Sequence, residues 1–226
     1  MTRYIHRHTD LSIPAKGAWL SGLLSHVPEA QVLLICFAAA PIASRTSREF
    51  VFANVFQKAG YASLLLEGLT GYEEKRDPDS RFDVPRLADR LVAAFEWISH
   101  QPQLAQLTLA ISATGTAAAA MIKASGAEAS GLFALVSRSG RLDLAGAAPL
   151  KRNRVPLLAI TGGADDATRG PATQAYALID GPKAWHEVDN ASEAFIEPGA
   201  MDAAAKASLQ WVERWRPATL DIADTG

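Results

Sequence analysis

The sequence lacks the features of a secreted, membrane or nucleic-acid-binding protein. One cysteine, Cys36, excludes an intrachain disulfide and favours a reducing, cytoplasmic compartment. The most apolar run, residues 32–40, is too short to span a bilayer, and no apolar stretch follows the N-terminal basic residues as in a secretory signal. The 22 Lys and Arg residues nearly balance 24 Asp and Glu residues, which gives no electrostatic reason to expect nucleic acid or a membrane surface as partner.

Metal-binding spacing is also missing, because one cysteine and five scattered histidines form no cluster, and we expect no metal and no cofactor. What the chain does have is apolar material: 49% of its residues are hydrophobic and 20% are charged, as in a packed globular protein. No repeat or low-complexity linker divides it. We therefore expect a single domain over residues 1–226, with residues 217–226 as a frayed tail.

Short continuous apolar runs recur along the chain. Runs without polar alternation are typical of parallel strands that are covered on both faces. Two earlier segments, residues 4–13 and 18–24, are expected to form an antiparallel pair around a turn at residues 14–17. The expected parallel strands are residues 31–37, 62–66, 107–111, 132–136, 156–161 and 184–188.

Helical patterns separate these strands. Ser47 and Asp83 are predicted to cap two helices, and Pro85 suits the first turn of the second. Further helices are expected over residues 116–125, from Gly170-Pro171 to Gly181, and after residues 197–199. The charged segment 68–81 is predicted to be a solvated loop. Together these elements predict an α/β fold, a mostly parallel sheet with antiparallel N-terminal strands and helices on both faces.

Four segments carry a resemblance to a known family. Residues 67–74 with 81–83, the run 136–146 (VSRSGRLDLAG) and residues 197–201 (EPGAM) resemble motifs of the dienelactone-hydrolase-like branch of the α/β hydrolases. The second run is similar to that branch's SRGGRPDLAG segment. The fourth, residues 161–165, resembles its GGxD turn. The resemblance covers roughly residues 15–215 and implies an α/β-hydrolase fold.

The resemblance also implies a Ser-His-Asp triad, which this sequence fills only in part. Asp165 is the counterpart of the aspartate. The family's nucleophilic serine falls on Ala113, and its histidine falls on Glu193. Without nucleophile and base, such a site loses about 10⁶ in turnover. The chain is therefore interpreted as a degenerate member of the family.

Other residues are expected beside this site. Ala39, Ala40 and Thr114 stand where the family's oxyanion-binding backbone lies, and Thr114 is also expected to cap the next helix. Arg45, Arg138 and Arg141 follow strands and are candidate ligand contacts. For Arg141, an ion pair with Asp143 is the preferred interpretation.

Two hypotheses follow for function. The first is a protein without serine-hydrolase activity that binds a small molecule or a partner. The second is an atypical enzyme in which Asp165 and Glu193 share one cleft and serve as general acid and base.

Overall fold

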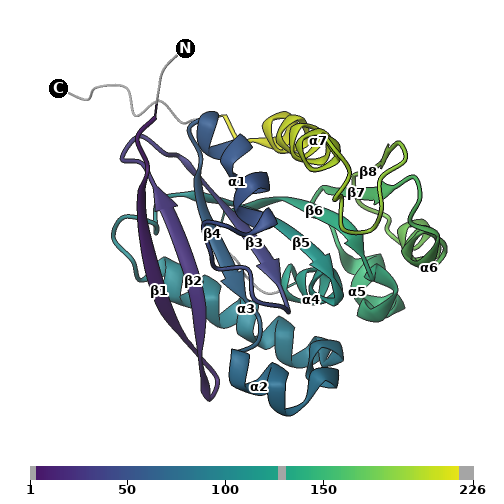
Figure 1. The fold of residues 1–226 in the computed structure, drawn as a ribbon, viewed down its shortest axis with the longest axis horizontal. Coiled ribbons are helices and arrows are strands. Elements are labelled where there is room, and N and C mark those ends of the chain that lie inside the picture. Colours follow the sequence, from purple (N-terminus) through teal and green to yellow (C-terminus); the bar gives the residue numbers. More distant parts are fainter. Residues whose placement is uncertain (1–3, 127–130, 219–226) are drawn as a thin grey trace.

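One eight-stranded sheet forms the centre of the molecule (Figure 1). The computed structural model describes residues 4–126 and 131–218. The strands lie in the order β1-β2-β4-β3-β5-β6-β7-β8, with β1 and β2 antiparallel and the others parallel to one another. Their bounds are β1 Arg7–Ala15, β2 Ala18–His26, β3 Val32–Ala38, β4 Ala62–Glu67, β5 Thr108–Gly115, β6 Leu132–Gly140, β7 Leu157–Gly162 and β8 Lys183–Val188. The predicted fold class is confirmed.

Helices cover both faces of the sheet, and each face has its own hydrophobic core. On one face α3 and α4 pack with residues such as Leu87, Leu91 and Ala117. On the other, α1 and α7 contribute Phe52 and Trp211. The helices are α1 Arg48–Lys58, α2 Gly71–Arg76, α3 Val84–Ser99, α4 Thr116–Ala124, α5 Ala147–Arg152, α6 Asp166–Ala177 and α7 Ala200–Trp215, with 3₁₀ turns η1 Pro78–Phe82 and η2 Leu142–Ala145.

Helix starts follow local capping chemistry. The Ser47 hydroxyl accepts from the Phe50 amide at 3.1 Å, and Asp83 accepts from the Arg86 amide at 3.1 Å, so both predicted caps are confirmed. The helix expected from Gly170-Pro171 begins earlier, at Asp166, and contains Pro171. That prediction was wrong because Asp165 caps the helix and sets its start. The expected tail falls mostly on residues 219–226, which lie outside the described residues.

No helix in the described parts of the chain has the length and apolar character needed to cross a membrane.

The buried centre of the sheet gives a direct test of the core. Leu109 and Leu158 are each 4% exposed, on β5 and β7. Leu109→Ala and Leu158→Ala are each expected to lower the free energy of unfolding by about 2–5 kcal/mol, through lost burial and a cavity. Urea denaturation measures this, and losses below about 1 kcal/mol at both sites would contradict the assigned core.

The charged segment 68–81 is ordered, which corrects the expectation of a solvated loop. Thr70 and Glu73 form a capping box at the start of α2. Glu73 also receives two hydrogen bonds from the guanidinium of Arg90 on α3, at 2.5 and 3.0 Å. Arg90 is buried and donates as well to the Gly68 carbonyl at 2.8 Å. The Arg90 hydrogen bonds lower the pKa of Glu73 to about 2.

This contact predicts an acid-sensitive share of the stability. Because the folded pKa of Glu73 lies below its unfolded value, its contribution is present at neutral pH and is lost as pH falls from about 5 to about 2. Glu73→Gln should cost about 1–2 kcal/mol at pH 7 and flatten the pH dependence in that window. Thermal melts from pH 7 to pH 2.5 measure this. Glu74→Gln is the matched control, and equal pH profiles for both variants would contradict the assignment.

Candidate functional site

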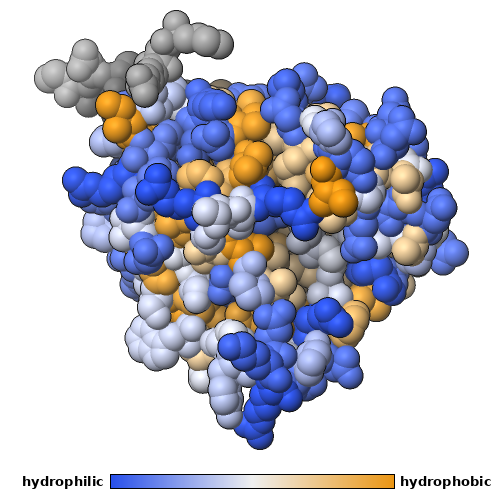
Figure 2. Space-filling model, viewed as in Figure 1, coloured by the Kyte–Doolittle hydropathy of each residue, from blue (hydrophilic) through white to orange (hydrophobic). Residues whose placement is uncertain are grey.

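The carboxyl ends of the parallel strands meet at one edge of the sheet, where open α/β sheets bind ligands. Asp165 follows β7, and Glu193 follows β8. The turn from β5 into α4 lies between them and the loop after β3. On the face seen in Figure 2, apolar residues lie in several patches between hydrophilic ones. Four hollows lined by described residues lie elsewhere on the molecule.

The turn between β5 and α4 is where a nucleophile would stand. Gly115 ends β5 with φ 52° and ψ −133°, and α4 begins at the next residue. This is a sharp strand-to-helix turn with a backbone that favours glycine. Ala113, predicted to hold the nucleophile's position, lies two residues earlier, inside β5, with no exposed surface. The turn residue is therefore Gly115, and neither position carries a nucleophilic atom.

Gly115 is the residue in the sequence that could have indicated where the turn lies. Counted from Gly115, the residues two before and two after are Ala113 and Ala117, small residues as the G-x-S-x-G spacing requires. The prediction that Thr114 caps α4 was wrong, because Gly115 is the N-cap residue and no side chain caps this helix. Thr114 lies half-buried beside Arg138 of the neighbouring strand.

The loop after β3 directs its backbone amides toward an acidic side chain. The amides of Ile42 and Ala43 each donate to Oε1 of Glu67 at 2.9 Å. Glu67 ends β4 and is 8% exposed, so this contact is largely shielded from water. Ala39 is buried and Ala40 is exposed, just before these amides. The sequence analysis included Glu67 in the segment 67–74 but gave it no role, because its partners Ile42 and Ala43 lie 25 and 24 residues earlier.

Asp165 has both carboxylate oxygens engaged within its own helix start. Its Oδ1 accepts from the Thr168 amide at 3.1 Å, and its Oδ2 accepts a short hydrogen bond from the Thr168 hydroxyl. Asp165 is 4% exposed. A carboxylate held in this way serves as the cap of α6.

Glu193 has a different environment, in the loop that connects β8 with α7. Its side chain is exposed, and among the described residues it has no hydrogen bond or ion pair. The loop itself lies against the Asp165 turn, because the Ala164 amide donates to the Ala191 carbonyl at 2.9 Å. Asp165 and Glu193 thus follow adjacent strands at one edge, with one carboxylate buried and the other in solvent. Their sharing of one cleft stays a prediction.

Arg138 does not belong to the loop where sequence analysis placed it. Strand β6 continues to Gly140, so Arg138 lies inside the strand and is 1% exposed. It forms a short ion pair with Glu49, and its Nε donates to the Ser112 hydroxyl at 3.0 Å. Its guanidinium lies 3.8 Å from the ring centroid of Phe52. These contacts join β6 to α1 and β5, which makes Arg138 a buried structural residue rather than a ligand contact.

The other two arginines differ from Arg138. Arg141 donates to both carboxylate oxygens of Asp143 at 2.9 and 2.8 Å, which confirms the predicted ion pair. The Arg141 hydrogen bonds lower the pKa of Asp143. Arg45 is exposed, just before α1.

Hydroxyl groups near this edge were also missed by the sequence analysis. Ser139 and Thr161 are 2% and 1% exposed, and their hydroxyls have no hydrogen-bond partner among the described residues. Ser139 also has φ 42°, which is uncommon for a residue with a side chain. Buried polar groups without a partner are rare in folded proteins, and a strained backbone such as that of Ser139 is a feature of many functional sites.

Comparison with known proteins identifies the family. A crystal structure of dienelactone hydrolase from Anabaena variabilis is 32% identical, covers 93% of this chain and 98% of that chain, and superposes with a TM-score of 0.83. The chain belongs to the dienelactone-hydrolase-like family of α/β hydrolases. A dienelactone hydrolase-like promiscuous phosphotriesterase from metagenomic libraries shares the fold, at 14% identity, 93% and 98% coverage and a TM-score of 0.74.

Two curated relatives match the chain over about half of their own length. A Mycobacterium tuberculosis protein of strain H37Rv, named "Putative phosphoribosyl transferase", is 34% identical over 206 residues, which is 91% of this chain and 46% of that protein. Strain CDC 1551 has a relative with the same name, identity and coverage. The chain thus spans about half the length of the curated relatives it matches. No protein-family model matches the chain.

Proposed function

We propose that this family member lacks serine-hydrolase activity and works as a binding module. The observation that carries the proposal is Gly115 at the strand-to-helix turn, where the chemistry needs a nucleophilic side chain. Two further features support the proposal. Glu193 stands in the place of the histidine, and the amides of the loop after β3 donate their hydrogen bonds to Glu67. Each of these would remove one part of acyl-transfer catalysis: the nucleophile, the base and the oxyanion donors.

A partner protein is the favoured ligand of this module. Three large apolar side chains are more than half exposed on segments at the carboxyl edge, namely Tyr72, Phe82 and Ile196. Exposed aromatic and aliphatic side chains are typical of association surfaces. The longer relatives carry the name putative phosphoribosyl transferase, and because the match covers 46% of their length, the name is not carried over to this chain.

The acid–base hypothesis finds less support. It requires one of the two carboxylates to exchange a proton with a bound substrate. Both oxygens of Asp165 accept from Thr168, and the Glu193 side chain extends into solvent. No contact in the described structure favours proton transfer between them.

Chemical labelling tests the absence of hydrolase activity. The purified chain is expected to remain unlabelled by a fluorophosphonate probe, because no activated serine stands at the turn. Intact-mass spectrometry measures the adduct, and the A. variabilis dienelactone hydrolase, treated in parallel, shows how a relative of this family responds. Stoichiometric labelling mapped to Ser112, Thr114 or Ser139 would overturn the proposal.

A further inference from the structure

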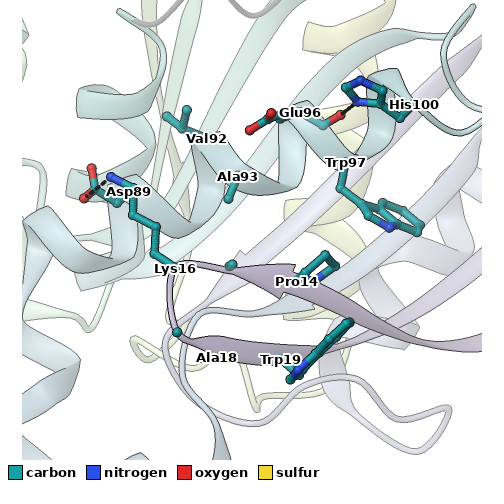
Figure 3. Close-up of a pocket in the computed structure, with 12 residues that line it drawn as sticks. Pro14, Lys16, Ala18, Trp19, Asp89, Val92, Ala93, Glu96, Trp97 and His100 are labelled. Atoms are coloured by element: carbon teal, nitrogen blue, oxygen red, sulfur yellow. Dashed lines mark hydrogen bonds and ion pairs between the residues drawn. The ribbon is translucent and has the colours of Figure 1, made fainter.

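A hollow whose lining includes none of the triad positions lies between the β1–β2 turn and α3 (Figure 3). Its volume is about 750 Å³, within the range of small-molecule sites. Pro14 and Trp19 stand on the hairpin side, and Ala93 and Trp97 face them from the helix. Trp19 is 66% exposed, although an indole is costly to leave in water. The hollow therefore offers aromatic walls to a flat apolar group.

The charges around the hollow differ between its two ends. At one end Lys16 forms an ion pair with Asp89 at 2.9 Å, so the charges of both side chains are balanced. At the other end are Glu96 and His100, one turn apart on α3. The Glu96 carboxylate is exposed and has no partner among the described residues. The lining thus carries one uncompensated negative charge, that of Glu96, about two helical turns after Asp89, the partner of Lys16.

The orientation of His100 strengthens this polarity. Its Nδ1 lies 2.7 Å from the Glu96 carbonyl oxygen, which can only accept, so Nδ1 carries the hydrogen. In the neutral ring Nε2 is then an acceptor. Glu96 and His100 together present acceptors and no competing donor to this end of the hollow. A group with several N–H donors and a positive charge matches that pattern.

We propose that this hollow binds a small aromatic cation, with its ring between Trp19 and Trp97 and its ammonium or guanidinium group at Glu96 and His100. Stacking against indole and the cation–π attraction favour such a ligand. Lys16 and Asp89 balance each other's charge at the other end, so the unpaired Glu96 carboxylate sets the direction of the cation. The site is independent of the proposed loss of hydrolase activity, because it shares no residue with the triad positions.

Tryptamine is the probe for this site, with indole-3-propionate as the anionic analogue of similar shape. We expect tryptamine to shift the indole NMR signals of Trp19 and Trp97 in a saturable manner below about 10 mM, and to bind at least about tenfold more tightly than the anion. Trp19→Ala should abolish binding without altering signals elsewhere, since that side chain is mostly exposed. Glu96→Gln should remove most of the preference for the cation.

Asp180→Asn is the matched control, because it removes one exposed negative charge outside the hollow. It should leave tryptamine binding unchanged. Equal affinity for the cation and the anion, the same loss in Asp180→Asn as in Glu96→Gln, or no saturable shift of Trp19 and Trp97 would each overturn the proposal. None of these outcomes bears on fluorophosphonate labelling, so the two proposals fail separately.

Discussion

A Gly115→Ser, Glu193→His double variant is expected to react with a fluorophosphonate probe at position 115, whereas Ala113→Ser, Glu193→His stays unreactive. The two variants differ only in where the hydroxyl is placed. Position 115 has φ 52° at the end of β5, and a Cβ added there meets no atom within 4 Å. Position 113 is fully buried inside the strand. Only the first hydroxyl can reach a substrate from the edge of the sheet.

The expected gain in ester hydrolysis is small, about 10–100-fold over the wild-type background with p-nitrophenyl acetate. A complete triad contributes about 10⁶ in turnover. Here the Asp165 carboxylate is hydrogen-bonded to Thr168, so it is not free to orient the new histidine. The Ile42 and Ala43 amides already donate to Glu67, so they are not free to bind the oxyanion. The serine also adopts a strained backbone, which costs of order 1–3 kcal/mol of stability.

Peptide mapping of the adduct decides between the two registers. Labelling at position 113 with none at position 115 would contradict the assignment of the turn to Gly115. Labelling at neither position, in variants whose thermal melts match the wild type, would contradict the view that the edge of the sheet remains open to substrate. Gly115→Ser alone is the control for the base, and it should react more slowly than the double variant.

The strands and most helix starts could be predicted from the sequence because their causes are local. Continuous apolar runs define β3, β4 and β7, and single capping residues such as Ser47 define helix starts. The register of the β5 turn was missed because motif similarity placed the nucleophile at Ala113. Gly115, which alone adopts the required φ without strain, was the better guide.

Contacts between distant parts of the chain could not be predicted in the same way. Glu67 ends an apolar strand, and its role depends on amides that approach only when β3 and β4 pair. Arg138 follows the apolar run of β6, so the strand was predicted to end before it. The partners that allow an arginine inside a strand, Glu49 and Phe52, are on a helix about 90 residues earlier. Sequence spacing carries no information about such contacts.

Replacing Arg138 should destabilise the protein strongly, because its side chain is buried and ion-paired. Arg138→Leu is expected to lower the free energy of unfolding by about 3–5 kcal/mol, because Glu49, whose side chain is 13% exposed, is left without its partner. The change also removes the contact with the Phe52 ring and the hydrogen bond to Ser112. Arg45→Leu, at an exposed position, should change stability by less than about 0.5 kcal/mol.

The double variant Glu49→Leu, Arg138→Leu shows how much of the lost stability comes from leaving the Glu49 carboxylate without its partner. If most of the loss in Arg138→Leu comes from the uncompensated Glu49 carboxylate, removing both charges should restore a large part of the stability. Urea denaturation of the wild type, Glu49→Leu, Arg138→Leu and the double variant gives the coupling between the two residues. A loss below about 1 kcal/mol in Arg138→Leu would contradict the structural role of this arginine and return it to the candidate ligand contacts. Additive losses would show instead that packing against Phe52, rather than the ion pair, holds β6 to α1.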